Sequence, residues 1–167
     1  MNEQSTSTPS RTAALLANHI KRTVRGPMWH GPALGELLTG VTPEQAAARP
    51  IKGAHTIWEI VRHVTAWAEI TRDRLKGHRT GDPTPEEDWP PTGTIDADAW
   101  EKTLDRLRDS HRALAADVKQ LDDEAIAANV PGLEYSVSNI LHGVIEHGTY
   151  HGGQIALLKR AAAAEGI

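Results

Sequence analysis

The chain has 167 residues, of which 39% are hydrophobic and 24% charged. This composition is typical of one folded domain and excludes both a disordered polar chain and a membrane-embedded one. The formal net charge is −4, which argues against nucleic acid as a partner, because phosphate-binding domains usually carry a basic excess. The absence of cysteine excludes disulfides, cysteine-bound zinc and a protein thiol nucleophile.

The N-terminal residues 1–9 are polar, and we expect them to form a flexible tail ahead of one domain over residues 10–167. The start of the chain lacks the cationic and apolar stretches of a signal peptide. No segment has the roughly 18 consecutive apolar residues that a membrane span requires. We therefore expect a cytoplasmic protein without a membrane partner.

Helical periodicity dominates the chain, and no alternating strand pattern of useful length is present. The predicted long helices cover about residues 10–25, 56–76, 96–121 and 136–163. Short helical pieces are expected near 32–38 and just after Thr42, and the proline-rich stretch 78–94 is expected to be a long loop, of a length that is often functional. Four long helices in a chain of this size predict an all-α, antiparallel four-helix bundle.

Histidines on the fourth predicted helix are the most informative feature. His147 and His151 are four residues apart, so they lie on one face of a helix. Their row continues through Val144 and Ile155 and therefore points into the bundle. This spacing allows two imidazoles to bind one metal ion at about 2.0–2.1 Å each.

His63 lies in an equivalent apolar row of the second predicted helix, between Ile60 and Trp67. Each of the three histidines could instead be a hydrogen-bonded core residue. Three inward imidazoles are harder to explain in that way, because every buried ring nitrogen needs a partner. Together they could form a three-nitrogen metal site with a position left for water or substrate.

Two other metal-binding patterns fit poorly. The HExxH pattern needs a glutamate directly after the first histidine, whereas Glu146 directly precedes His147. The Glu-x-x-His pattern of di-iron bundles needs a spacing of three residues, whereas Glu59 is four residues from His63. The remaining histidines are interpreted as solvated, capping or surface residues, and none is assigned a role: His19, His30, His55, His78, His111 and His142.

Two tryptophans are candidates for the lining of a pocket, Trp67 beside His63 and Trp89 in the predicted loop. Trp89 could close over the site as a lid or anchor the loop to the bundle. Gly148 and Gly152 share a row beside the histidines. Because glycine costs roughly 1 kcal/mol against alanine inside a helix, we expect close packing there.

The chain resembles the DinB/YfiT-like superfamily of bacterial four-helix metalloproteins over roughly residues 11–160. The matching stretches are residues 29–32, 37–38, 56–63 with Trp67, 88–90 and 146–155. The resemblance implies a divalent ion, zinc or nickel, held by His63, His147 and His151. It also implies a homodimer, an up-up-down-down helix order and a small-molecule substrate.

Characterised relatives include transferases and isomerases that use a low-molecular-weight thiol such as bacillithiol, mycothiol or glutathione, and others are described as metal-dependent hydrolases. The resemblance therefore implies an ion that activates a thiol or water for S-transfer or hydrolysis on a small electrophile. No residue is assigned as the general base, because Glu146 and Tyr150 lie off the row of the ligands. The alternative is a non-catalytic dimer for stress response or small-molecule binding, with a structural metal.

Overall fold

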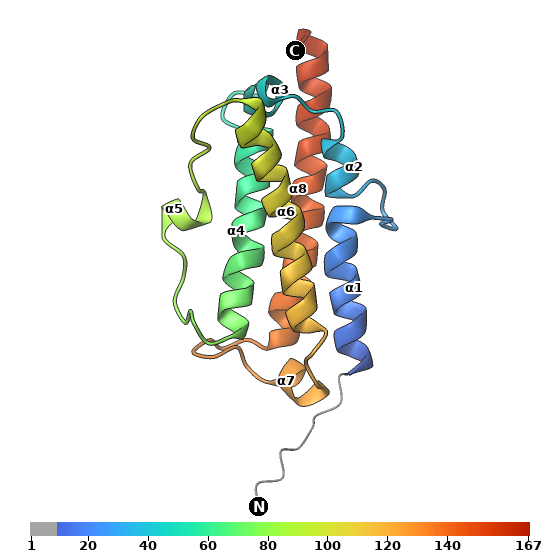
Figure 1. Ribbon diagram of the computed structural model, residues 1–167, viewed down its shortest axis with the longest axis vertical. Coiled ribbons are helices and arrows are strands. Elements are labelled where there is room, and N and C mark those ends of the chain that lie inside the picture. The colour runs from blue at the N-terminus through green and yellow to red at the C-terminus, as the bar shows by residue number, and fades with distance from the viewer. Residues whose placement is uncertain (1–9) are drawn as a thin grey trace, which may run out of the picture.

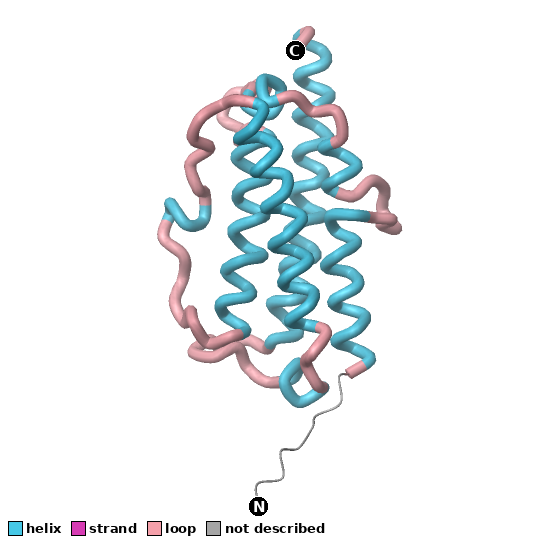
Figure 2. Tube along the Cα trace, in the orientation of Figure 1, coloured by secondary structure: helices cyan, strands magenta, loops and turns pink. Residues whose placement is uncertain are grey.

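The computed structural model describes residues 10–167, and these form an all-α bundle (Figure 1). The four long helices are α1 (Arg11–Arg25), α4 (Ile57–Leu75), α6 (Ala97–Val118) and α8 (Val137–Glu165). Four short helices lie in the connections: α2 (Leu34–Leu38), α3 (Pro43–Ala47), α5 (Pro85–Asp88) and α7 (Asp123–Ala127). Figure 2 shows helices joined by loops and no strand in the described part of the chain. The prediction of an all-α fold is confirmed, whereas the predicted tail, residues 1–9, lies outside the described residues.

Side-chain caps explain why the long helices begin where the sequence predicts. Ser10, Thr56, Asp96 and Ser136 each accept a hydrogen bond from the backbone N–H three residues later. Such a cap satisfies one of the free N–H groups of the first turn and is typically worth about 1 kcal/mol. The observed starts therefore agree with the predicted ones to within a residue.

Contacts near the helix ends fix the directions of the long helices. The contacting pairs are Ser10 N with Leu121 O at 3.0 Å, Arg72 Nε with Asp117 Oδ2 at 2.5 Å, and Arg74 Nη1 with Tyr135 OH at 2.9 Å. Thus α1 is antiparallel to α6, α4 is parallel to α6, and α8 is antiparallel to α4. In chain order the helices run up, down, down and up (Figure 1). This chain order differs from the up-up-down-down order that the resemblance implies.

The hydrophobic core has two parts, and the paired histidines of α8 lie between them. One cluster includes Ile20, Leu114 and Leu141, and the other includes Trp58 and Ile155. Along α8, the first cluster extends to residue 144 and the second begins at residue 155. Residues 147–151 therefore occupy the layer between two dry clusters, where polar side chains need partners within the protein.

The connection between α4 and α6 was predicted to be a loop, but it contains α5. The Thr84 side chain accepts a hydrogen bond from the backbone N–H of Glu87, which caps this four-residue helix. Glu87 also pairs with Arg79. As Figure 1 shows, the segment runs along the outside of the bundle beside α4, so that Asp88 and Trp89 reach His63. No helix within residues 10–167 is long and apolar enough to cross a membrane.

Candidate metal centre

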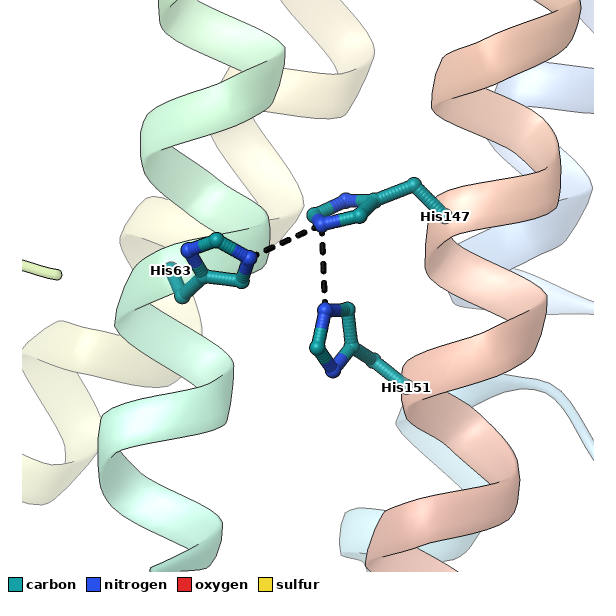
Figure 3. A group of neighbouring side chains, drawn as sticks. All are labelled: His63, His147 and His151. Atoms are coloured by element: carbon teal, nitrogen blue, oxygen red, sulfur yellow. Dashed lines mark hydrogen bonds between the residues drawn. The ribbon is translucent and has the colours of Figure 1, made fainter. Parts of the chain in front are cut away.

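The structure brings together the three histidines that the sequence selects. His63 extends from α4, and His147 and His151 extend from α8 toward it (Figure 3). The Nε2 atom of His147 lies 2.9 Å from that of His63 and 3.0 Å from that of His151. Three ring nitrogens, one from each residue, lie within 4.8 Å of one another. A single ion could therefore contact all three residues.

Neighbouring groups fix the protonation of two of these rings. His63 Nδ1 is 2.7 Å from the backbone oxygen of Asp88, and His151 Nδ1 is 2.7 Å from the side-chain oxygen of Gln154. Both oxygens only accept hydrogen bonds, so each Nδ1 is the donor. A neutral imidazole carries one N–H, and the Nε2 atoms of His63 and His151 are therefore bare lone pairs.

His147 cannot satisfy both of these lone pairs. If its Nε2 carries the hydrogen, it donates to either His63 or His151, and the lone pair of the other ring is left without a donor; if its hydrogen is on Nδ1, all three Nε2 lone pairs face one another. A divalent cation between the rings would accept all three lone pairs at once. Among residues 10–167, no fourth His, Asp or Glu belongs to this group. The donor set thus fits an ion held by three imidazoles with a position left open, as in catalytic zinc sites.

Burial keeps these imidazoles neutral. It lowers the pKa of His147 to about 3, with further repulsion from the rings of His151 and His63. Burial also lowers the pKa of His151 to about 4, against the opposing hydrogen bond to Gln154. The pKa of His63 is lowered by the same desolvation. Neutral rings are the form that binds metals, so the group is ready to bind an ion at neutral pH.

The α5 segment covers one side of the site. Trp89 is stacked between two imidazoles, with ring centroids 3.8 Å from His63 and 3.6 Å from His55. Trp67 donates its Nε1–H to Asp88 Oδ1 at 2.6 Å. Trp89 therefore covers the face of the His63 ring and also ties the loop to the bundle.

Beside the histidines lies a cleft of about 500 Å³. Its walls come from α4, α8, the end of α5 at Asp88 and the loops that contain Asp82 and Tyr135. Small-molecule sites typically have this size and this mixture of aromatic walls and few polar groups.

A ligand in the cleft reaches His63 and His147 directly, whereas His151 lies outside the lining. Of the two tryptophans that were candidates for the lining, Trp67 is part of it and Trp89 is not.

Close packing holds α8 against α1 beside the histidines. A Cβ atom added at Gly148 would lie 2.3 Å from Thr23 Cγ2, so only glycine fits there. At Gly152 the same atom would lie 3.5 Å from Leu37, which is ordinary contact. The expected close approach is therefore real at Gly148 and not at Gly152.

Sequence reasoning misplaced one histidine and overlooked two other residues. His111, expected on the surface, is buried, and its Nε2 has no hydrogen-bond partner in the described part of the chain. The spacing of Leu107, His111 and Leu114 on α6 places all three on one inward face, which was the available signal. His55, which the sequence gives no role, stacks on Trp89, and Arg74 lines the cleft. His19, His30, His78 and His142 are exposed.

The sequence model of the DinB superfamily matches residues 29–155. This chain belongs to the DinB superfamily. The segment matched to the DinB superfamily contains the three histidines, α5 and the whole cleft lining. No match was found among curated proteins or among solved structures. The chemistry of this DinB-superfamily protein must therefore be argued from its own residues.

Proposed function

We propose that this DinB-superfamily protein is a metal-dependent enzyme in which His63, His147 and His151 hold zinc or nickel. It transfers the sulfur of a low-molecular-weight thiol, or the oxygen of water, to a small electrophilic substrate. The observation that carries this proposal is the convergence of three Nε2 atoms, two with their hydrogen fixed on Nδ1, beside an open cleft. Imidazole donors suit both metals.

A bound divalent ion supplies Lewis acidity, which lowers the pKa of a thiol or water beside it. The residues of the chain orient the imidazoles and shape the site around them. The Asp88 carbonyl and the Gln154 amide orient two of the imidazoles. Trp89 keeps water from one face of His63, while Trp67 and Val144 line the side from which a ligand enters.

The reaction that this site suits best is displacement at carbon. The thiol loses its proton, its sulfur forms a bond to the electrophilic carbon, and the leaving group departs with its bonding electrons. Because the chain has no cysteine, the thiol must arrive as a cosubstrate. Glu146 and Tyr150 are exposed, so we assign neither as the base. The proton lost by the thiol passes to solvent through the cleft. With water as the nucleophile, the same arrangement supports hydrolysis.

The alternative is a non-catalytic dimer in which the metal stabilises the fold. Two observations favour the enzyme over this alternative. The bundle has dry apolar clusters on both sides of the histidine layer, so its core does not depend on an ion. The cleft also reaches His63 and His147 directly, which a purely structural ion would not require.

We also propose that the protein is a homodimer that acts on small molecules in the cytoplasm. Exposed aromatic and aliphatic side chains support an interface between copies, among them Trp29, Tyr150 and Leu157. Exposed apolar groups of this size are typical of interaction surfaces when they are contiguous. Light scattering of the purified protein measures the mass in solution, and a monomer at micromolar concentration contradicts the dimer.

The experiment that tests the enzyme uses protein purified without a histidine tag and loaded with zinc or nickel. Bacillithiol, mycothiol and glutathione are each offered with monochlorobimane, whose thioether product is fluorescent, and hydrolysis is followed with activated esters. We expect one pairing to react faster in the presence of the loaded protein. The His147→Ala/His151→Ala double variant should lose that rate, while the exposed His142→Ala variant should keep it. Equal rates in all three proteins, or no reaction with any pairing, would contradict the proposal.

A further inference from the structure

One face of α4 forms a wall of the cleft from the metal centre to the far end. His63, Trp67, Thr71 and Arg74 succeed one another at helical spacing, and all four line the cleft. The Trp67 ring lies between the two ends, with its centroid 6.5 Å from that of His63 and 5.6 Å from Arg74 Cζ. A single indole therefore separates the metal centre from a guanidinium.

Arg74 is a buried cation with a weak counter-charge. The residue is only 2% exposed. Its Nη1 donates to Tyr135 OH at 2.9 Å, and its Nη2 donates to Gly81 O and to Asp82 Oδ1, both at 3.2 Å. Within residues 10–167, its Nε has no partner. Among these residues the only carboxylate in contact with Arg74 is that of Asp82, whose side chain is 95% exposed to water.

A structural ion pair with Asp82 does not account for the burial of the Arg74 guanidinium. Removing a guanidinium from water is costly unless a well-placed anion compensates for it. The exposed Asp82 carboxylate is largely solvated and holds Arg74 through one contact at 3.2 Å. The nearby Arg72, by contrast, pairs with Asp117 at 2.5 Å on the outer surface of the same helix end. Thr71 Oγ1, also on the cleft wall, is buried and has no partner among residues 10–167.

We infer that Arg74 binds the carboxylate of a ligand whose other end reaches the metal centre at His63 and His147. This inference rests on the proposed function and names the chemistry of its ligand, an acid with its reactive thiol or electrophilic carbon at the opposite end. In the free protein the Asp82 carboxylate occupies this position on Arg74, and the carboxylate of the ligand displaces it on binding. A guanidinium suits a carboxylate because its planar N–H groups pair with both oxygens, and Tyr135 adds a hydroxyl at the same end of the cleft.

The first test uses metal-free protein, so that it does not depend on the proposed function. Hexanoate and hexanol are titrated into nitrogen-15-labelled protein while the Trp67 indole N–H signal is followed by NMR. We expect hexanoate to shift this signal with an affinity about tenfold higher than that of hexanol, as for a hydrogen-bonded charge pair. The Arg74→Gln variant should lose the difference. The exposed Asp82→Asn change removes the competing carboxylate without disturbing the core, and it should increase the affinity for hexanoate alone.

The second test uses cobalt-substituted protein, whose visible spectrum reports a thiolate at the metal. Mercaptopropionate, mercaptohexanoate and mercaptooctanoate are compared with the mercapto-alcohols of equal length. One length of acid should bind about tenfold more tightly than its alcohol, and Asp82→Asn should widen that gap.

The outcomes separate the two proposals. If acids and alcohols bind equally in both tests, and Asp82→Asn changes neither, the inference about Arg74 is wrong, even if Arg74→Gln fails to fold. If hexanoate is preferred by metal-free protein but no thiol changes the cobalt spectrum, the Arg74 site stands and the proposed thiol chemistry fails. If thiols bind cobalt without any preference for acids in either test, the enzyme stands and the carboxylate site fails.

Discussion

His63 Nδ1 donates a hydrogen bond to the backbone oxygen of Asp88 at 2.7 Å. This bond joins α4 to the α5 segment and fixes which nitrogen of His63 faces the other two histidines. Partners of this kind orient metal-binding histidines and raise their basicity. The position of the α5 segment and the affinity of the metal centre are therefore linked.

That link predicts the effect of Trp89→Ala. Trp89 loses its stacking on His63 and on His55, and each such contact is worth about 0.5–1.5 kcal/mol. We expect zinc affinity to fall about tenfold, measured by competition with a chromophoric chelator. Trp89→Phe, which keeps a stacked ring, should lose much less. An unchanged affinity in Trp89→Ala would mean that the indole only anchors the loop.

Gln154 orients His151 through the bond at 2.7 Å. Replacing it with leucine removes that acceptor and frees the ring to rotate. We expect a loss of metal affinity of about 10–100-fold, as is usual when a partner of a bound histidine is removed. His142→Ala is the matched control on the same helix, because His142 is exposed and its removal should leave the affinity unchanged. Equal affinities for Gln154→Leu and wild type would contradict the assigned hydrogen positions.

Gly148 and Gly143 on α8 should respond oppositely to alanine. At Gly148 the new methyl group would lie 2.3 Å from Thr23 Cγ2, and Thr23 is held by its bond to the His19 carbonyl. We expect Gly148→Ala to lower the free energy of unfolding by about 1–3 kcal/mol. Gly143→Ala meets nothing within 4 Å and should raise it by up to about 1 kcal/mol. Urea denaturation measures both, and adding Thr23→Ser to Gly148→Ala should restore stability, because serine lacks Cγ2.

The neutral histidines make the metal-free protein sensitive to acid. The pKa values of His147 and His151 in the folded state, about 3 and about 4, lie below the ordinary value of 6.5. Between these limits the unfolded chain binds protons that the native state does not, so stability falls as the pH falls from about 6.5 toward 4. Each histidine contributes a slope of about 1 kcal/mol per pH unit in this range. Urea denaturation at several pH values should show a shallower slope for His147→Leu and an unchanged one for His142→Ala. Parallel curves for all three proteins would contradict the lowered pKa values.

Local signals were sufficient to predict the four long helices and the ligand row, but not α5 or α7. Capping residues such as Ser10 and Thr56 act within three residues of themselves, and His147 and His151 share a face through helical geometry alone. The apolar rows place the histidines of α4 and α8 on inward faces, because both helices must bury a stripe in a common core, but the rows alone do not select α4 and α8 as neighbours. The approach of His63 to His147 is a consequence of the pairing of these two helices.

Contacts made across long loops could not be predicted in the same way. Trp89 reaches His63 because α5 is capped by Thr84 and folded against the bundle, which no periodicity in a proline-rich segment reveals. Arg74 lies in the last turn of α4, where a basic residue is expected for its interaction with the helix dipole. Its burial depends on Tyr135 and on the loop after α4, both of which are specified by tertiary packing.

The most direct test of the central claim is the metal content per chain, measured by elemental mass spectrometry on protein purified without a histidine tag. The His63→Ala, His147→Ala/His151→Ala and His142→Ala variants are measured beside the wild type. We predict about one zinc or nickel ion per chain in wild type and in His142→Ala, a large loss in His63→Ala, and none in the double variant. Wild-type protein that retains no metal after incubation with zinc and nickel, or a double variant that retains a full complement, would contradict the three-histidine site.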